Sequence, residues 1–287
     1  MKLASSVLLV RPAAFGFSEE AAATNVFQRR SGVLPAEIVA RARTEVDGVA
    51  SALRAAGVHV TVVEDTADPP KPDAVFPNNW FSAEDCGAAV LYPMAIAGRR
   101  AERRPEIFRT IAGFSRIVDL SHREDAGGYL EGTGSLVLDR ERKVAFACLS
   151  PRTTPDALQA FGDALGYRIV AFRAALDGAA IYHTNVVLAL TPDVAVLGVE
   201  CVRDSGLLLA ALDRDVVAVT GDQIRRFTGN ILALQGREGP VALMSRTAHD
   251  AFTPAQLARL PPAIVVDIPT IEEVGGGSAR CMVAELW

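Results

Sequence analysis

The stretch Glu131–Phe172, EGTGSLVLDRERKVAFACLSPRTTPDALQAFGDALGYRIVAF, contains a structural unit that the chain repeats. Its residue pattern predicts a strand at Ser135–Leu138, a polar turn, a strand at Val144–Leu149, a helix at Pro155–Leu165 and a strand at Tyr167–Phe172. The unit is therefore a hairpin, a helix and a third strand. Helices that alternate with strands favour the α/β class over an all-β fold.

The same order of elements is predicted twice more downstream. After His183 come strands at Val186–Leu190 and Val194–Val199, a helix at Leu207–Leu212 and a strand at Val216–Val219. After Gly229 come strands at Ile231–Leu234 and Val241–Met244, a helix at Pro254–Leu260 and a strand at Ile264–Asp267. Near the start, the pattern predicts a strand at Val7–Val10, a helix at Pro35–Ala56 and a strand at Val58–Val62.

Five residues mark the starts of the hairpins: Asn79, Gly134, Asn185, Asn230 and Cys281, at intervals of 55, 51, 45 and 51 residues. Repeats of this size stack or form a ring, because one unit cannot bury its own apolar face. If five units close around an axis, the five hairpin starts converge at one end of the central channel. We therefore expect residues 1–287 to form a single α/β domain with a pseudo-five-fold repeat.

The composition is that of a globular protein, with 50% hydrophobic and 22% charged residues. A net charge of −5 and the lack of a basic run argue against nucleic-acid binding. We also expect no membrane association, because no apolar segment is long enough to span a bilayer and Val7–Val10 is too short for a signal peptide. Four scattered cysteines without a C-x-x-C pair fit a reducing cytoplasm, and the four histidines lack metal-site spacing.

The glycine-rich stretch Gly275–Met282, GGGSARCM, presents Cys281 beside a sharp turn. Taken alone it is most simply a turn followed by a buried cysteine, but the ring places it near His183 and Glu131. A nearby imidazolium would make the thiol a strong nucleophile, and His183 could then move protons. Glu131 could bind a substrate nitrogen or keep His183 protonated. The structural alternatives are a solvated loop histidine and a turn carboxylate.

Several motifs together resemble the pentein, or guanidino-group modifying, superfamily of arginine deiminases, dimethylarginine dimethylaminohydrolases and amidinotransferases. They are Phe76–Asn79, Glu131–Gly134, Leu149–Thr153, His183–Asn185 and the glycine-rich stretch ending at Cys281. The resemblance covers nearly the whole chain. It implies a five-bladed α/β propeller (pentein fold) with a catalytic Cys281, His183 and Glu131 and no cofactor or metal. The segment Phe76–Ser82 is most similar to the citrulline-utilisation hydrolase branch.

Three departures from arginine deiminases bear on the substrate. Asn79, Asn185 and Gly134 stand where those enzymes have aspartates. Two carboxylates neutralise a guanidinium, whereas asparagines donate to a carbonyl and accept from NH groups, as a neutral ureido group requires. We therefore expect Asn79 and Asn185 to bind citrulline rather than arginine, with Asn78 and Asn230 completing the substrate-binding set. The structural alternative is that Asn78 and Asn79 only form a turn.

Resemblance to the dimethylarginine hydrolases implies how the amino-acid end is bound. Asp73 would bind the α-ammonium and Arg152 the α-carboxylate, for which a planar guanidinium is suited. Arg100 is the second candidate, while Arg99, Arg103 and Arg104 are expected to form a solvated cluster. For Phe15 and Phe17, core packing is favoured over a role as a lid.

The predicted activity is hydrolysis of L-citrulline to ornithine, ammonia and carbon dioxide through a covalent Cys281 intermediate, with backbone N–H groups of the glycine-rich stretch stabilising negative charge. On the same fold the alternatives are an arginine deiminase, a dimethylarginine dimethylaminohydrolase or an amidinotransferase. A non-catalytic binding propeller is disfavoured by the Cys and His pair. The expected partner is a small amino-acid substrate. The sequence is compatible with a homodimer and does not fix the oligomeric state.

Overall fold

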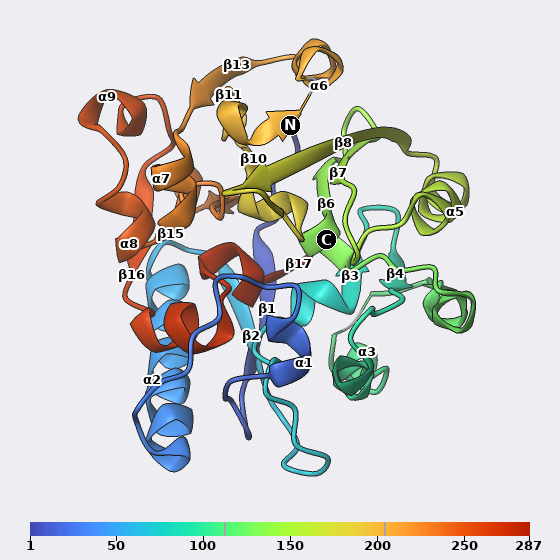
Figure 1. The fold of residues 1–287 in the computed structure, drawn as a ribbon, viewed down its shortest axis with the longest axis vertical. Coiled ribbons are helices and arrows are strands. Elements are labelled where there is room, and N and C mark those ends of the chain that lie inside the picture. Colours follow the sequence, from blue (N-terminus) through green and yellow to red (C-terminus); the bar gives the residue numbers. More distant parts are fainter. Residues whose placement is uncertain (112, 204) are drawn as a thin grey trace.

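The computed structural model describes residues 1–111, 113–203 and 205–287, and within them five sheets share one design (Figure 1). In order along the repeat, their three principal strands are β17 (Ala284–Leu286), β1 (Ser6–Arg11) and β2 (His59–Glu64); β3 (Phe81–Ala83), β4 (Ala88–Leu91) and β5 (Arg116–Asp119); β6 (Leu136–Asp139), β7 (Val144–Cys148) and β8 (Arg168–Leu176); β10 (Leu188–Leu190), β11 (Val194–Leu197) and β13 (Asp215–Ala218); β14 (Leu232–Gly236), β15 (Gly239–Ser245) and β16 (Ala263–Val266). The short strands β12 (Val202–Arg203) and β9 (Ala179–Ala180) both pair with β8.

In each sheet the middle strand pairs antiparallel with the first strand and parallel with the third. A parallel neighbour requires a crossover, and a helix lies in each one. These helices are α2 (Pro35–Ala55), α3 (Ile107–Thr110), α5 (Pro155–Leu165), α6 (Gly206–Ala211) and α9 (Pro254–Leu257). The predicted hairpin, helix and strand unit is confirmed, and the sheet around β4 follows it as well.

The predicted bounds agree with the structure to within two residues, except at two ends that differ by three and four residues. The strand predicted from Val186 begins at Leu188, because Thr184–Val186 forms the short helical turn η4. The strand predicted to end at Phe172 continues to Leu176, and the helix predicted to end at Leu260 ends at Leu257. The α2 prediction holds because its apolar positions form one stripe that is buried against the first and fifth sheets: Ile38, Ala42, Val46, Val49 and Leu53.

Short helical turns carry the residues at the hairpin starts. They are η1 (Pro77–Asn79) before β3, α4 (Gly132–Ser135) before β6, η4 before β10 and η7 (Ala279–Met282) before β17, while Asn230 precedes β14. The turn α4 contacts both η1 and η4, and η1 contacts η7. The expected convergence of the hairpin starts is therefore confirmed.

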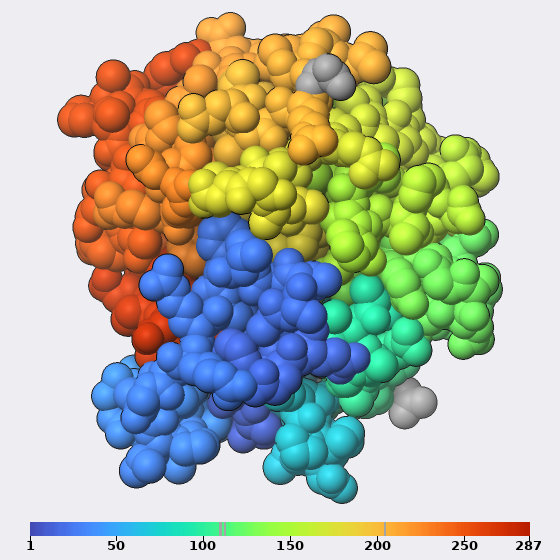
Figure 2. Space-filling model, viewed as in Figure 1, coloured from blue at the N-terminus to red at the C-terminus, as the bar shows by residue number. Residues whose placement is uncertain are grey.

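The N-terminal segment covers this convergence point. Residues between β1 and α2, including α1 (Glu19–Ala22), lie across the middle of the face shown in Figure 2. The remaining helical turns are η2 (Ala97–Glu102), η3 (Ser121–Ala126), η5 (Val199–Cys201), α7 (Gly221–Arg225), α8 (Arg246–His249) and η6 (Ile271–Gly275). Among the described residues, none of the helices has the length and apolar character that crossing a membrane requires.

Candidate active site

The structure brings together five of the residues predicted from the sequence. Asp73, Asn79, Arg152, His183 and Cys281 all line one tight pocket beneath the N-terminal segment, with a cavity volume of about 10 Å³. Asp73 and Asn79 precede β3, Arg152 follows β7, His183 precedes β10 and Cys281 precedes β17. The pocket therefore depends on the whole fold.

His183 and Glu131 form a buried pair at this pocket. His183 Nε2 lies 2.8 Å from Glu131 Oε2, and the other carboxylate oxygen accepts the Ala95 N–H at 3.1 Å. Burial opposes ionisation of Glu131, but Arg152, the hydrogen bond from His183 and Arg99 outweigh it and hold the pKa of this carboxyl well below its usual range. Because the carboxylate accepts from Nε2–H, His183 Nδ1 is left as the basic nitrogen.

The surroundings of His183 favour its neutral form. Burial lowers the pKa of His183 to about 4, with Arg152 and Arg99 acting in the same direction and Glu131 opposing them. The lowered pKa favours a neutral His183 in the resting enzyme over the imidazolium that we expected beside the thiol. Sequence spacing places a histidine near a cysteine, but it does not reveal that both are desolvated.

Asn230 and Asn185 contact the thiol of Cys281. The Nδ2 atoms of Asn230 and Asn185 lie 3.2 and 3.6 Å from Sγ, and neither asparagine lines the pocket. Burial raises the pKa of the Cys281 thiol, and these hydrogen bonds offset only part of that effect. The two asparagines are thus placed to stabilise the sulfur when it becomes anionic, rather than to surround a substrate group.

The glycines before Cys281 allow close packing. Gly276 has φ +63° in the left-handed region, and a Cβ on Gly275 or Gly277 would lie 2.8 Å from the ring of Phe76. The N–H groups of Gly276 and Cys281 already donate to the carbonyl oxygens of Glu272 and Ser278. These two N–H groups are therefore not available for the charge stabilisation expected from this stretch.

Asn79 has a fixed amide orientation. Its Oδ1 accepts from Arg99 Nη1 at 2.8 Å, and its Nδ2 donates to Asn78 Oδ1 at 3.1 Å. A Cβ built on Gly134 would lie 2.5 Å from Asn79 Nδ2 and 2.7 Å from His183 Nδ1. Gly134 therefore provides the space in which an amide donor and the basic nitrogen stand side by side. Asn78 itself is buried outside the pocket.

The arginine assignments need correction. Arg99 is only 4% exposed, lines the pocket and makes a bidentate ion pair with Glu102 at 2.8 Å, so it does not belong to a solvated cluster. Arg100 lies outside the pocket, where its Nε donates to the Met94 carbonyl oxygen and pairs with Glu124. The pocket-facing member of this arginine run is Arg99, not Arg100. Arg103 and Arg104 are partly exposed and pair with Glu124 and Glu106.

One carboxylate oxygen of Asp73, Oδ2, forms an ion pair with Arg99 Nε at 3.8 Å but accepts no hydrogen bond within the described parts of the chain. The residue is 2% exposed, and Oδ1 accepts from Gln28 Nε2 at 3.3 Å. Burial raises the pKa of Asp73, although Arg99 and Arg152 oppose it. A buried acceptor without a donor is costly, so Oδ2 is placed to accept from a ligand such as an ammonium group.

Arg152 links the pocket to the N-terminal segment. Its Nε donates to Thr24 Oγ1 and its Nη2 to the Ala21 carbonyl oxygen, both at 2.8 Å, while Nη1 lies 3.4 Å from Glu131 Oε2. Its guanidinium also stacks over the Tyr182 ring, 4.9 Å from the ring centroid. A substrate carboxylate that binds Arg152 must therefore replace Thr24 Oγ1 or the Ala21 carbonyl oxygen as a hydrogen-bond acceptor.

Sequence reasoning missed Asn25 and Gln28, which line the pocket from above, and gave no role to Tyr182. Asn25 and Gln28 both donate to the Gly275 carbonyl oxygen and so connect the N-terminal segment to the glycine-rich stretch. No motif or periodicity surrounds them. Phe15, by contrast, is buried in the core with Phe76, as expected, and Phe17 packs partly buried against the same cluster. No group of His, Cys, Asp and Glu residues suited to a metal occurs in the described ranges.

A family model for N,N dimethylarginine dimethylhydrolase, eukaryotic, matches residues 11–287. The chain belongs to this family. Membership confirms the resemblance to the guanidino-modifying penteins. A comparison with curated proteins finds no match.

Solved structures support the fold of this dimethylhydrolase family member. The substrate-bound N-terminal domain of ArgZ, an arginine dihydrolase from the ornithine-ammonia cycle in cyanobacteria, matches with a TM-score of 0.76 and 16% identity over 98% of this chain and 97% of that domain. Unliganded AgrE matches with a TM-score of 0.78 and 17% identity over 98% of this chain and 39% of its own. A dimethylarginine dimethylaminohydrolase adduct with S-methyl-L-thiocitrulline matches with a TM-score of 0.66 and 14% identity over 98% of this chain and 99% of that chain. The chain spans about two fifths of full-length ArgZ and AgrE.

Proposed function

We propose that this family member hydrolyses a ureido amino acid, with L-citrulline converted to ornithine, ammonia and carbon dioxide. The main support is the environment of Asn79. Arg99 occupies Oδ1, so Asn79 presents an N–H to the pocket beside His183 Nδ1. A ureido oxygen can accept from that N–H, whereas a guanidinium has only donors and would bring a second cation next to Arg99.

Attack on the substrate begins from a neutral thiol and a neutral imidazole. His183 Nδ1 takes the thiol proton as Cys281 Sγ bonds to the ureido carbon, and Asn185 and Asn230 donate to the sulfur. Asn79 Nδ2 donates to the oxygen on which negative charge develops. The imidazolium is stabilised by Glu131 and gives its proton to the departing amine as the carbon–nitrogen bond breaks.

A thiocarbamate on Cys281 results, and water removes it. His183 Nδ1, neutral again, takes a proton from the water that attacks the thiocarbamate carbon. That proton returns to the sulfur as the carbon–sulfur bond breaks, which releases a carbamic acid that loses carbon dioxide. The ArgZ structure covalently bound to a reaction intermediate is consistent with a covalent route on this fold.

The amino-acid end of the substrate binds at the other side of the pocket. Asp73 Oδ2 accepts from the α-ammonium, and Arg152 donates to the α-carboxylate after it exchanges Thr24 and Ala21 as acceptors. The N-terminal segment then closes over the bound substrate. The five sheets that build this pocket are inferred to form a five-bladed propeller; first strands of adjacent sheets contact each other in the pairs β17–β3, β6–β10 and β10–β14.

A second candidate is an arginine dihydrolase, which would carry out two successive hydrolyses. It is favoured by the match to ArgZ and to AgrE bound to L-arginine, the latter covering all of this chain at 17% identity. Such an enzyme would release ornithine, two ammonia molecules and carbon dioxide from arginine. It would share the covalent chemistry and differ in accepting a cation beside Arg99.

Direct assay separates these activities. Purified protein is incubated with citrulline, arginine and methylarginines, and ornithine, citrulline and ammonia are measured. We expect ornithine and one ammonia per citrulline consumed. Two ammonia molecules per ornithine formed from arginine would establish the dihydrolase instead. Accumulation of citrulline from arginine or methylarginines, without citrulline turnover, would exclude both.

The pH dependence of kcat/KM follows from the neutral thiol and imidazole pair. His183 must be unprotonated to accept the thiol proton, and its pKa of about 4 means that activity is lost only as the pH falls through that value. Burial raises the pKa of Cys281, so the thiol stays protonated near neutral pH and its ionisation does not change kcat/KM there. We expect a plateau from about pH 5 to about pH 8. A half-maximal point between about pH 6 and 7 would indicate a resting ion pair instead.

A further inference from the structure

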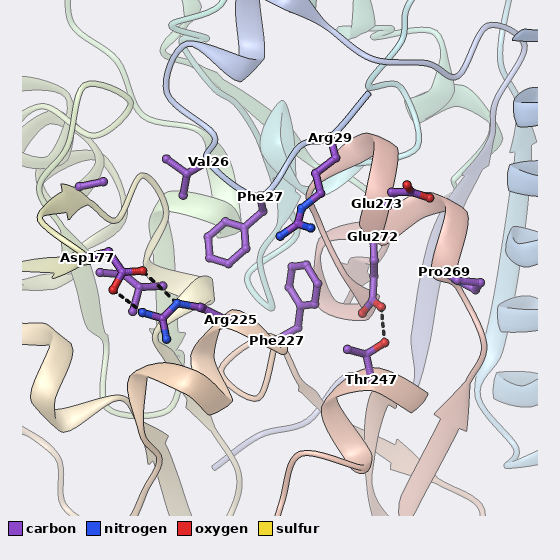
Figure 3. Close-up of a pocket in the computed structure, with 12 residues that line it drawn as sticks. Val26, Phe27, Arg29, Asp177, Arg225, Phe227, Thr247, Pro269, Glu272 and Glu273 are labelled. Atoms are coloured by element: carbon purple, nitrogen blue, oxygen red, sulfur yellow. Dashed lines mark hydrogen bonds and ion pairs between the residues drawn. The ribbon is translucent and has the colours of Figure 1, made fainter. Parts of the chain in front are cut away.

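A second cavity of about 680 Å³ lies next to the candidate active site, and the proposed reaction makes no use of it (Figure 3). Its volume is typical of pockets for small organic ligands. The N-terminal segment forms a wall shared by both spaces: Asn25 and Gln28 line the Cys281 pocket, whereas Val26, Phe27 and Arg29 line the second cavity. A ligand here would therefore contact the back of the segment that covers the active site.

The inner walls of the cavity are apolar. The rings of Phe27 and Phe227 lie 5.4 Å apart between centroids, and Leu176 and Pro269 add to the same surface. Figure 3 shows the two rings facing the space toward which Arg29 also points. Two aromatic faces side by side are suited to a flat or aliphatic group of similar size.

Two of the polar groups around the cavity are already satisfied. Arg225 pairs with Asp177, with Nε 2.9 Å from Oδ2. The carboxylate of Glu272 accepts from Thr247 Oγ1 and from Ser278 Oγ, both at 2.6 Å. These groups shape the cavity but offer little to a ligand.

Arg29 is different. Its backbone N–H donates to the Glu273 carbonyl oxygen at 2.8 Å, but its guanidinium makes no hydrogen bond or ion pair with any residue in the described ranges. Arg29 and Glu273 are both exposed at the rim, so water screens both of their charges. A guanidinium above an apolar cavity complements a carboxylate whose body is apolar.

We propose that this cavity binds a small carboxylate with an aromatic or aliphatic body, and that its occupancy holds residues 25–29 over the Cys281 pocket. The carboxylate bonds to Arg29 and the body lies against the packed rings of Phe27 and Phe227. The coupling passes through Phe27, whose ring packs 6.4 Å from that of Tyr182. Tyr182 lines the Cys281 pocket and donates to the Gly276 carbonyl oxygen at 3.0 Å.

Calorimetric titration with 3-phenylpropanoate tests the site, with 3-phenylpropan-1-ol as the neutral ligand of similar shape. We expect the carboxylate to bind and the alcohol to bind at least about tenfold more weakly. Arg29→Gln should weaken binding of the carboxylate about tenfold or more, whereas Arg30→Gln, which removes a guanidinium that stacks on Phe17 outside the cavity, should not change it. Phe227→Leu should weaken both ligands. Absence of binding, or binding unaffected by Arg29→Gln, would overturn the assignment.

Amide hydrogen exchange tests the coupling independently of catalysis. Bound carboxylate should slow exchange of the Phe27 and Arg29 amides, which donate to Asn25 Oδ1 and the Glu273 carbonyl oxygen, by about tenfold. Arg29→Gln should remove this protection at the same ligand concentration. Binding without slower exchange would contradict the coupling. Because neither measurement requires turnover, the result does not depend on whether citrulline is the substrate.

Discussion

Replacing Cys281 with serine should lower turnover of the substrate by at least about 10⁴-fold while leaving the fold intact. The hydroxyl is nearly isosteric with the thiol, and Asn230 and Asn185 can still donate to it. A neutral His183 is too weak a base to generate an alkoxide at a useful rate. The measurement is kcat by ornithine release, with circular dichroism and thermal unfolding to verify the fold.

The matched control is Cys86→Ser. Cys86 is the exposed thiol of this chain, whereas Cys148 and Cys201 are buried like Cys281. We expect this variant to retain full activity. Turnover by the Cys281 variant within about tenfold of the parent would remove the cysteine from its proposed role, whatever the substrate proves to be.

Gly134→Ala should reduce kcat by about 100-fold or more and lower the thermal stability, because the methyl group enters a packed, buried site. The new methyl group would lie 2.5 Å from Asn79 Nδ2 and 2.7 Å from His183 Nδ1, closer than side-chain contacts permit. Both groups must therefore move, and displacement of a catalytic base by about 1 Å is enough for an effect of this size. Single-turnover kinetics would show the loss in the formation of the covalent intermediate.

Gly48→Ala serves as the control for a glycine replacement. A Cβ at Gly48 has no atom within 4 Å, and the residue lies inside α2, where alanine is favoured. We expect unchanged kcat and equal or higher stability. If folded Gly134→Ala keeps full activity, the juxtaposition of Asn79 and His183 is not the catalytic feature that we infer.

Local periodicity and spacing were sufficient to predict much of the fold. The apolar residues of α2 recur every three or four positions and form one buried face, so this helix can be predicted from the sequence alone. The hairpin starts occupy equivalent positions in the five repeats. In a ring of repeats, equivalent positions lie at the same end of the central channel. The convergence of Asn79, Gly134 and Cys281 therefore needed no knowledge of chemistry.

The arginine run from Arg99 to Arg104 shows where such reasoning fails. Its members have similar local surroundings, and burial is decided by tertiary packing under the N-terminal segment. One local signal was present: Glu102 lies three residues after Arg99, on the same side of a helical turn, and the two form the buried ion pair. Asn25 and Gln28 had no such signal, because their role comes from contacts with residues about 250 positions away.

Protonation states also lie beyond sequence spacing. The positions of His183 and Cys281 suggested an ion pair, yet burial disfavours charge on both. The depth of each side chain, set by the whole chain, decides which form is present. A motif can identify reacting groups without revealing which of them carries the proton.

The pairing of β17 with β1 has a consequence for protein synthesis. These strands come from opposite regions of the chain, and Cys281 lies in the turn that leads directly into β17. The other four sheets can form as a ribosome extends the chain, but the first sheet gains β17 only after residues 284–286 have left the exit tunnel. Cys281 is therefore the last of the five hairpin starts to be synthesised and positioned.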